Sequence, residues 1–295
     1  MISFRKLSDC TWNEMTTIWN KGFEGYFVPL HFNEAQLNIH LVKGDISPKH
    51  SFIAFYNNEP AGFVLNGFRQ VGDKKVAWNG GTGVAKEFRG FGIGKAMMQK
   101  CMAIYKDEQV DIATLEAIER NEPAIRLYEK FGYSITNQLY FYDTKKVPTS
   151  LPVRKTDYRL ERISSKAVKK LPFWNKWTPW QNQITNQPDD SQAIIVSDIN
   201  GNPIGYAHIR DIFDSNGEKI QTILCHCEIK PGFNKKETLE QLLLEVFAFE
   251  RVSLNKNPFT FSTYNLLLDD CVKEVLESWN FEKKMGQVWM QQTFH

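Results

Sequence analysis

The sequence has little of what marks secreted or membrane-spanning proteins. Only 5 of its 295 residues are cysteine, and a small, odd, scattered set does not read as a disulfide framework. The first residues contain no apolar segment of the kind that directs secretion, and no run approaches the roughly 18 apolar residues of a membrane span. We therefore expect a cytoplasmic protein with reduced thiols and no membrane partner.

The chain also lacks an excess of charge of one sign. It carries 36 basic residues against 34 acidic ones, a net charge of +2, whereas a nucleic-acid surface needs a clear basic excess. Cys225, His226 and Cys227 are residue types that bind metals, but in a strand Cys225 and Cys227 share one face while His226 points to the other. No second ligand pair follows at zinc-site spacing. We expect neither a nucleic-acid partner nor a metal.

Strands and helices alternate along the first half. Periodicity and turn residues predict strands over 1–6, 51–56, 61–68, 75–84, 111–117 and 133–143, and helices over 11–21, 33–42, 92–105 and 122–130. Residues 144–157 hold two prolines, several charges and no periodicity, which indicates a linker. The predicted domains are therefore residues 1–143 and residues 158–295.

The second half weakly repeats the first. Residues 194–206 read as a strand, a turn with proline and a returning strand, and they echo residues 52–63. Residues 275–281 echo residues 127–133 in the same order and at a similar offset. Two such matches indicate a duplicated fold.

A glycine-rich turn joins the strand at 75–84 to the helix at 92–105. It contains Arg89, Gly90, Phe91, Gly92, Ile93, Gly94 and Lys95. Backbone N–H groups at a helix N-terminus attract an anion, and glycine lets a phosphate approach the backbone closely. The spacing R-x-x-G-x-G fits neither the dinucleotide fingerprint nor the P-loop.

The strand before this turn ends in Asn79-Gly80-Gly81-Thr82-Gly83-Val84. Glycine weakens a strand, so its presence marks a bulge or the close approach of a ligand. An extended ligand arm would bond to such a strand as an added strand does. The alternative is a flexible loop.

A second motif begins at Asn121, a good helix N-cap, and ends at Gly132-Tyr133. Its pattern, N-x-x-A-x-x-L-Y-x-K-x-G-Y, together with R-x-x-G-x-G after a strand, resembles the GNAT superfamily of acetyl-CoA-dependent N-acetyltransferases. The resemblance covers roughly residues 1–143. It implies an α+β fold of two tandem GNAT-like domains, each a mixed, mostly antiparallel sheet flanked by helices.

The resemblance also implies roles for individual residues. The backbone from Arg89 to Lys95 would hold the CoA pyrophosphate. Thr82, Gly83 and Val84 would bind pantetheine and the acetyl carbonyl, and Asn121 would contact CoA. Tyr128 would protonate the leaving thiolate. Because a free tyrosine is a weaker acid than a thiol, a strong hydrogen bond is the alternative to full proton transfer, and core packing is the structural alternative.

The sequence does not decide which group is the catalytic base or which residues contact the acceptor. Glu116 stands on the strand before Asn121, where some members of the superfamily carry a base, while others use a chain of water molecules. A structural role for Glu116 is the third possibility. In this superfamily the loop after the first helix contacts the acceptor, which here implicates Glu24, Tyr26 and Phe27. Aromatic packing under the sheet is the alternative reading of that loop.

The second half lacks both motifs. Its matching turn keeps a single glycine, Gly232, and Pro231 removes a backbone donor. We expect that this domain has lost its CoA site and shapes or covers the acceptor cleft.

The sequence therefore predicts transfer of an acetyl group from acetyl-CoA to a primary amine by direct attack on the thioester. One rival is an acyl-CoA-binding interaction or regulatory module without turnover. The other is an enzyme that acetylates protein N-termini or lysines. The acceptor and the oligomeric state stay open.

Overall fold

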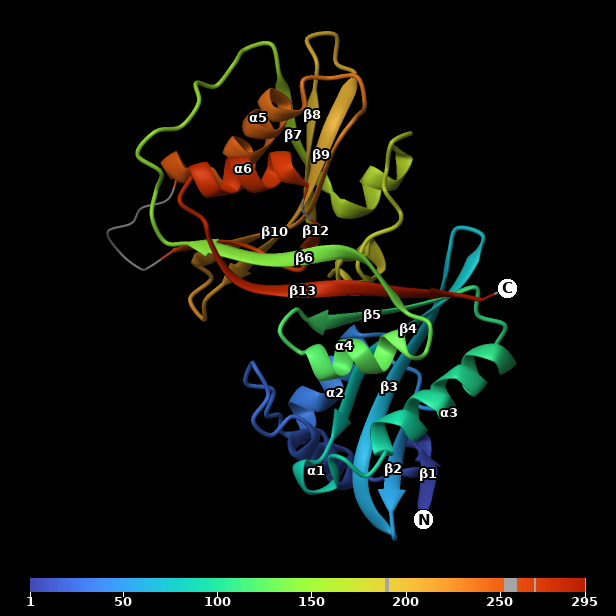
Figure 1. Cartoon of the computed structure of the whole chain (residues 1–295). Helices are drawn as coiled ribbons and strands as arrows, with labels where there is room; N and C mark the ends of the chain where they lie inside the picture. The colour runs from blue at the N-terminus through green and yellow to red at the C-terminus, as the bar shows by residue number, and fades with distance from the viewer. Residues whose placement is uncertain (189–190, 252–258, 268, 295) are drawn as a thin grey trace. The chain divides into compact units, whose positions relative to one another are not determined.

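A computed structural model describes the chain except for residues 189–190, 252–258, 268 and 295. The chain forms two compact units (Figure 1). The first unit contains Met1–Asn137 and Val288–His295, and the second contains Gln138–Gln287.

The first unit is built on a mixed, mostly antiparallel sheet. Its strands are β1 (Ile2–Lys6), β2 (Phe52–Tyr56), β3 (Glu59–Val71), β4 (Lys74–Val84) and β5 (Ile112–Ile118), which are neighbours in this order. The pairs β1–β2, β2–β3 and β3–β4 are antiparallel, and β4–β5 is parallel. Part of β13 (Glu282–Thr293) follows β5.

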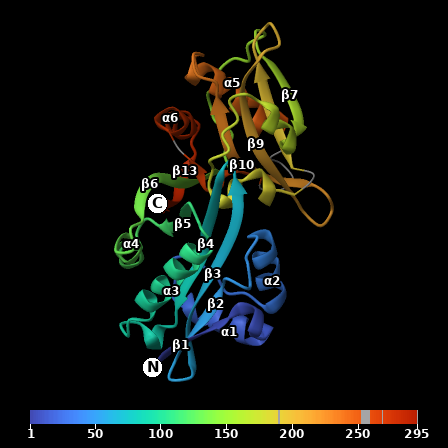
Figure 2. The same cartoon turned by 90° about the vertical axis from the view of Figure 1, so that its right-hand side faces the viewer.

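Helices cover both faces of this sheet (Figure 2). Helices α1 (Trp12–Gly22) and α2 (Glu34–Lys43) lie on one face, and α3 (Ile93–Asp107) and α4 (Glu122–Glu129) on the other. Thr11 and Asn33 each begin a helix with a capping box, which satisfies backbone donors of the first turn. The apolar stripe of α3 is fully buried at Met97, Met98 and Cys101, so it anchors the helix on the sheet.

The second unit repeats this plan. Its strands are β6 (Ser134–Thr144, from Gln138 onward), β7 (Arg159–Ser164), β8 (Gln192–Ser197), β9 (Pro203–Phe213), β10 (Lys219–Ile229), β11 (Thr260–Thr263) and β12 (Leu266–Leu267). Its helices are α5 (Lys235–Phe247) and α6 (Asp270–Ser278). Short 3-10 turns occur at Leu7–Asp9, Lys86–Phe88, Ser165–Lys170, Trp180–Asn182, Ile184–Asn186 and Phe249–Arg251.

Strand register shows how closely the two units correspond. In the first unit the parallel pairing of β4 with β5 ends at Asn79 and Leu115, and β4 bulges at the next residue. In the second unit the parallel pairing of β10 with β11 ends at Leu224 and Thr263, and β10 also bulges at the next residue. The strands and helices predicted for the first half are confirmed, and so is the duplicated fold.

The compact units differ from the predicted domain boundaries of 1–143 and 158–295. Strands β6 and β13 each begin in one unit and end in the other. Val288 and Met290 of β13 are buried in the core of the first unit, beside residues of α3 and β5. An alternating strand pattern does not show which sheet the strand joins, so the sequence could not assign these last residues.

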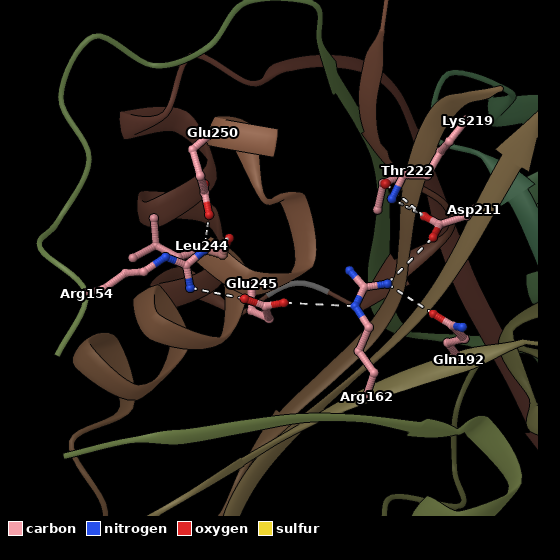
Figure 3. Close-up of polar contacts among 9 residues, drawn as sticks. All are labelled: Arg154, Arg162, Gln192, Asp211, Lys219, Thr222, Leu244, Glu245 and Glu250. Carbon is pink, nitrogen blue, oxygen red and sulfur yellow. Dashed lines mark hydrogen bonds and ion pairs between the residues drawn. The ribbon is translucent and has the colours of Figure 1, made fainter. Parts of the chain in front are cut away.

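Residues 145–158, which include most of the predicted linker, contain no helix or strand. However, this segment is tied to the second unit (Figure 3). The Arg154 guanidinium contacts the carbonyl of Leu244 and the carboxylates of Glu245 and Glu250 at 2.7–3.1 Å. From the sheet, Arg162 lies 4.0 Å from Glu245. Each exposed pair contributes little alone, and a network contributes more.

No helix in the described part of the chain is long and apolar enough to cross a membrane. All five cysteines are free thiols.

Candidate active site at the split between β4 and β5

The site lies where two parallel strands part. Strands β4 and β5 pair from Val76 and Ile112 up to Asn79 and Leu115. Beyond these residues β4 continues to Val84 and β5 to Ile118 without pairing to each other. The edge of β4 that faces β5 therefore leaves the ladder at this point, and its backbone groups need other partners.

A buried asparagine holds the bulge that opens the split. Asn79 is 5% exposed, and its Oδ1 accepts from the Gly81 N–H at 3.2 Å and the Thr82 hydroxyl at 2.9 Å. These bonds replace ladder bonds that the bulge removes. Sequence reasoning missed Asn79, although a polar residue at a buried strand position was a usable signal.

The glycines near the end of β4 are explained by different contacts. A Cβ on Gly80 would lie 2.5 Å from the Trp78 ring, so the bulge predicted for this segment needs glycine here. A Cβ on Gly83 would lie 2.5 Å from Phe63 and 3.1 Å from Gly22 at the end of α1. Gly83 therefore serves helix packing, whereas Gly81 has its nearest neighbour at 3.4 Å. Packing explains two of the three glycines without a ligand.

The glycine-rich turn is open to solvent. Gly90 and Gly92 have positive φ angles of 87° and 77°, and no atom lies within 4 Å of an ideal Cβ at either position. Gly92 is the N-cap of α3 and provides no side-chain cap. The first N–H groups of α3 have no carbonyl partner within the helix, so they are available to an anion. Of the remaining turn residues, Ile93 is buried while Phe91 and Lys95 are exposed.

Arg89 has a role that the motif did not predict. Its Nε donates to the Val84 carbonyl at 3.2 Å, and its Nη2 lies 3.3 Å from the Glu24 carbonyl and 3.5 Å from the Gly22 carbonyl. A cation at the C-terminal end of α1 is stabilised by that helix dipole. Arg89 thus links the glycine-rich turn to the loop after α1.

Tyr128 and Thr82 meet at the mouth of the split. Tyr128 is 8% exposed on α4, and its hydroxyl is hydrogen-bonded to the Thr82 side chain. Burial raises the pKa of Tyr128, while the bond to Thr82 acts in the opposite direction. The hydroxyl therefore stays protonated at ordinary pH and can donate a hydrogen bond.

Tyr26 and Asn121 also lie together. Burial raises the pKa of Tyr26, and a hydrogen bond with the Asn121 side chain partly offsets this rise. Asn121 precedes α4 but makes no side-chain cap, contrary to its predicted capping role. Its amide instead contacts the loop after α1.

Glu116 stands on β5 just beyond the end of the pairing. Its Oε2 accepts from the indole N–H of Trp78 at 2.6 Å. The carboxylate is partly buried. It therefore lies at the apex of the split, where the sequence placed a candidate base.

Two predicted acceptor residues point to solvent. Glu24 is exposed and contributes its carbonyl, not its carboxylate, to the contact with Arg89. Phe27 is 49% exposed, and its ring lies 5.3 Å from that of Tyr26. The structure brings Tyr26, Asn121, Tyr128 and Thr82 to one place and leaves Glu24 outside it.

The corresponding split in the second unit is bridged by an amide. Asn182 Nδ2 lies 2.7 Å from the carbonyls of Cys225 and Tyr264 and 2.9 Å from that of Asn265. These carbonyls belong to β10 and to the residues after β11. The first turn of α5 is capped by Asn234, whose Oδ1 accepts from the Glu237 N–H.

The bulge in β10 also corrects one argument from the sequence. Residues 225–227 were expected to alternate regularly between the two faces of a strand. The register shifts between Leu224 and His226, so alternation does not hold across this segment. Among the described residues, no group of three or more His, Cys, Asp or Glu side chains is arranged to hold a metal ion.

The model of the acetyltransferase (GNAT) family matches residues 12–133. No curated protein sequence matched the chain.

Several solved structures have the same fold along the whole chain. A GCN5-related N-acetyltransferase from Sphaerobacter thermophilus has 12% identity and a TM-score of 0.67, covering 99% of this chain and 95% of its own. A putative acetyltransferase from Pyrococcus horikoshii has 15% identity and a TM-score of 0.59, covering 100% and 89%. A tandem GNAT protein from the clavulanic acid biosynthesis pathway has 10% identity and a TM-score of 0.63, covering 99% and 98%.

The motifs at Arg89 and Asn121 lie inside the matched segment, and the split and the open helix N-terminus lie beside them. The fold of the whole chain is similar to that of tandem GNAT proteins, and residues 12–133 match the model of the GNAT acetyltransferase family.

Proposed function

We propose that the first unit moves an acetyl group from acetyl-CoA to a primary amine. The observation that carries the proposal is the split of β4 from β5 beside the open N-terminus of α3, with Tyr128 at its mouth. An anion site, an unpaired strand edge and a hydroxyl donor are the parts that this reaction needs.

The residues present fit CoA. The N–H groups of the first turn of α3, from Gly92 to Lys95, would bind the pyrophosphate, since the helix dipole favours negative charge there. The empty space around Gly90 and Gly92 admits phosphate oxygens to the backbone. The edge of β4 from Thr82 to Val84 would bind pantetheine in the manner of an added strand.

The chemistry then needs a neutral amine and a stabilised thiolate. The amine nitrogen attacks the thioester carbonyl, so a C–N bond forms, the C–S bond breaks and one proton is released. Glu116 or a chain of water molecules takes the proton of the amine. Backbone N–H groups of β4 polarise the carbonyl. Tyr128 keeps its proton, because burial raises its pKa, and it donates a hydrogen bond to the leaving thiolate.

We also propose that the second unit binds no CoA. Asn182 already bonds to the backbone at its split, and Asn234 already caps α5. These side chains occupy part of the backbone that would face CoA in a working copy.

A thiol-release assay tests the proposed function. The purified full chain is mixed with acetyl-CoA and an alkyl diamine, an aromatic ethylamine, an amino sugar or a peptide with a free N-terminus and a lysine. We expect free CoA to appear only with an amine present. Preference for the peptide would favour a protein acetyltransferase. Tight acetyl-CoA binding without release for any amine would favour a regulatory module and contradict the proposal.

A further inference from the structure

Trp78 is a buried tryptophan whose indole N–H donates a hydrogen bond to the carboxylate of Glu116. It is 2% exposed, and a buried indole N–H needs an acceptor. That acceptor is the Oε2 of Glu116 at 2.6 Å. Tryptophan to carboxylate bonds of this kind are short and charge-assisted when the carboxylate is ionised.

The ring spans the point where the strands part. Trp78 pairs in register with Thr114, the last pair but one before the split. Glu116 is two residues beyond Thr114, so both side chains point to the same face of β5. The indole thus reaches from the paired part of β4 to the unpaired part of β5.

The Trp78 ring fills space that side chains at two glycine positions would need. A Cβ on Gly80 would lie 2.5 Å from Cζ3 of Trp78, and a Cβ on Gly44 would lie 3.3 Å from the same atom. Gly44 is the C-cap of α2 and Gly80 is the bulged residue of β4. Because the ring fills the space that these side chains would take, it has little freedom to turn.

We infer that Trp78 is a positioning residue for the proposed transfer reaction, acting through its hydrogen bond to the Glu116 carboxylate. The inference rests on the proposed function and names a group that would orient the Glu116 carboxylate as the base. The indole fixes one oxygen of the carboxylate and so sets the direction in which the carboxylate can receive a proton from the amine.

A double-mutant cycle tests the inference. Trp78→Phe, Glu116→Gln and the double variant are compared with the wild-type chain in the full-length protein, using the most reactive amine of the thiol-release panel. We expect Glu116→Gln to lower kcat about 10²-fold or more. Trp78→Phe should lower kcat about tenfold and leave the KM for acetyl-CoA within about twofold, since it removes one hydrogen bond to a charged group. In the Glu116→Gln background, Trp78→Phe should cause no further loss.

Two further variants separate positioning from folding. Trp279→Phe removes a tryptophan that is 3% exposed in the core of the second unit, and it should lower stability without changing kcat. Glu116→Asp shortens the carboxylate away from the indole, and it should mimic Trp78→Phe even if that variant folds poorly.

The outcomes are distinct. An unchanged kcat for Trp78→Phe would overturn the positioning role, and so would losses of kcat that multiply in the double variant. In either case, turnover by the wild-type chain would still support the proposed function. An unchanged kcat for Glu116→Gln would likewise overturn the positioning role. Absence of turnover with every amine would remove the proposed function and the inference with it.

Discussion

A single hydroxyl group carries much of the proposed mechanism. The Tyr128 hydroxyl meets Thr82 at the mouth of the split, and burial raises its pKa. Tyr128→Phe removes the hydroxyl and keeps the ring. We expect kcat to fall about 10²–10³-fold if chemistry limits the rate, because a hydrogen-bond donor to the developing thiolate is lost, with acetyl-CoA affinity nearly unchanged and stability altered by about 1 kcal/mol or less.

Single-turnover rates are the measurement for Tyr128, because slow product release would mask part of the effect. Tyr133→Phe is the matched control, since its ring lies 6.0 Å from that of Tyr128 in the same core. A rate for Tyr128→Phe within about twofold of wild type, far below the expected contribution of a hydrogen-bond donor to the thiolate, would make Tyr128 a packing residue.

A substitution at Gly92 tests the proposed anion site, again through a single residue. Gly92→Glu would place a negative charge at the N-terminus of α3, where φ is 77°. We expect acetyl-CoA affinity by calorimetry to collapse while the fold survives. Gly201→Glu is the control, because Gly201 also has a positive φ of 82° and open space around it. Equal affinity of Gly92→Glu and Gly201→Glu for acetyl-CoA would show that the anion site does not lie at this turn.

At the scale of elements, β13 carries a prediction that the sequence alone did not allow. Met290 is fully buried in the core of the first unit. Met290→Ala should therefore destabilise that unit by about 2–5 kcal/mol and speed hydrogen exchange in peptides from residues 1–137. Leu242→Ala, equally buried on α5, should act on the second unit instead. Faster exchange confined to residues 138–287 in Met290→Ala would contradict the unit boundaries.

Local sequence predicted the elements well because their signals are local. Thr11 and Asn33 cap helices through their own side chains, and the bulge-forming Gly80 and the positive-φ Gly92 act through their lack of one. The contacts of Arg89 with the end of α1, and of Trp78 with Glu116, join segments far apart in the chain. No periodicity or spacing reports such contacts, so they became visible only in three dimensions.

At the scale of the whole molecule, the duplicated fold should hold one cofactor. The two units share register and bulge, but among the residues that the structure describes the open glycine-rich turn occurs in the first unit only. We expect calorimetry to give one acetyl-CoA per chain, and Gly92→Glu to abolish that binding. A second equivalent of acetyl-CoA, or protection of residues 230–236 from hydrogen exchange by acetyl-CoA, would show that the second unit also binds it.

Transfer of a labelled acetyl group tests the central claim most directly. Acetyl-CoA with an isotopically labelled acetyl group is mixed with the full chain and each amine of the panel, and the products are identified by mass spectrometry. The account predicts label on the nitrogen of at least one amine with the wild-type chain and none with Gly92→Glu. Label that stays on acetyl-CoA for every amine, although the wild-type chain binds it, would contradict the account.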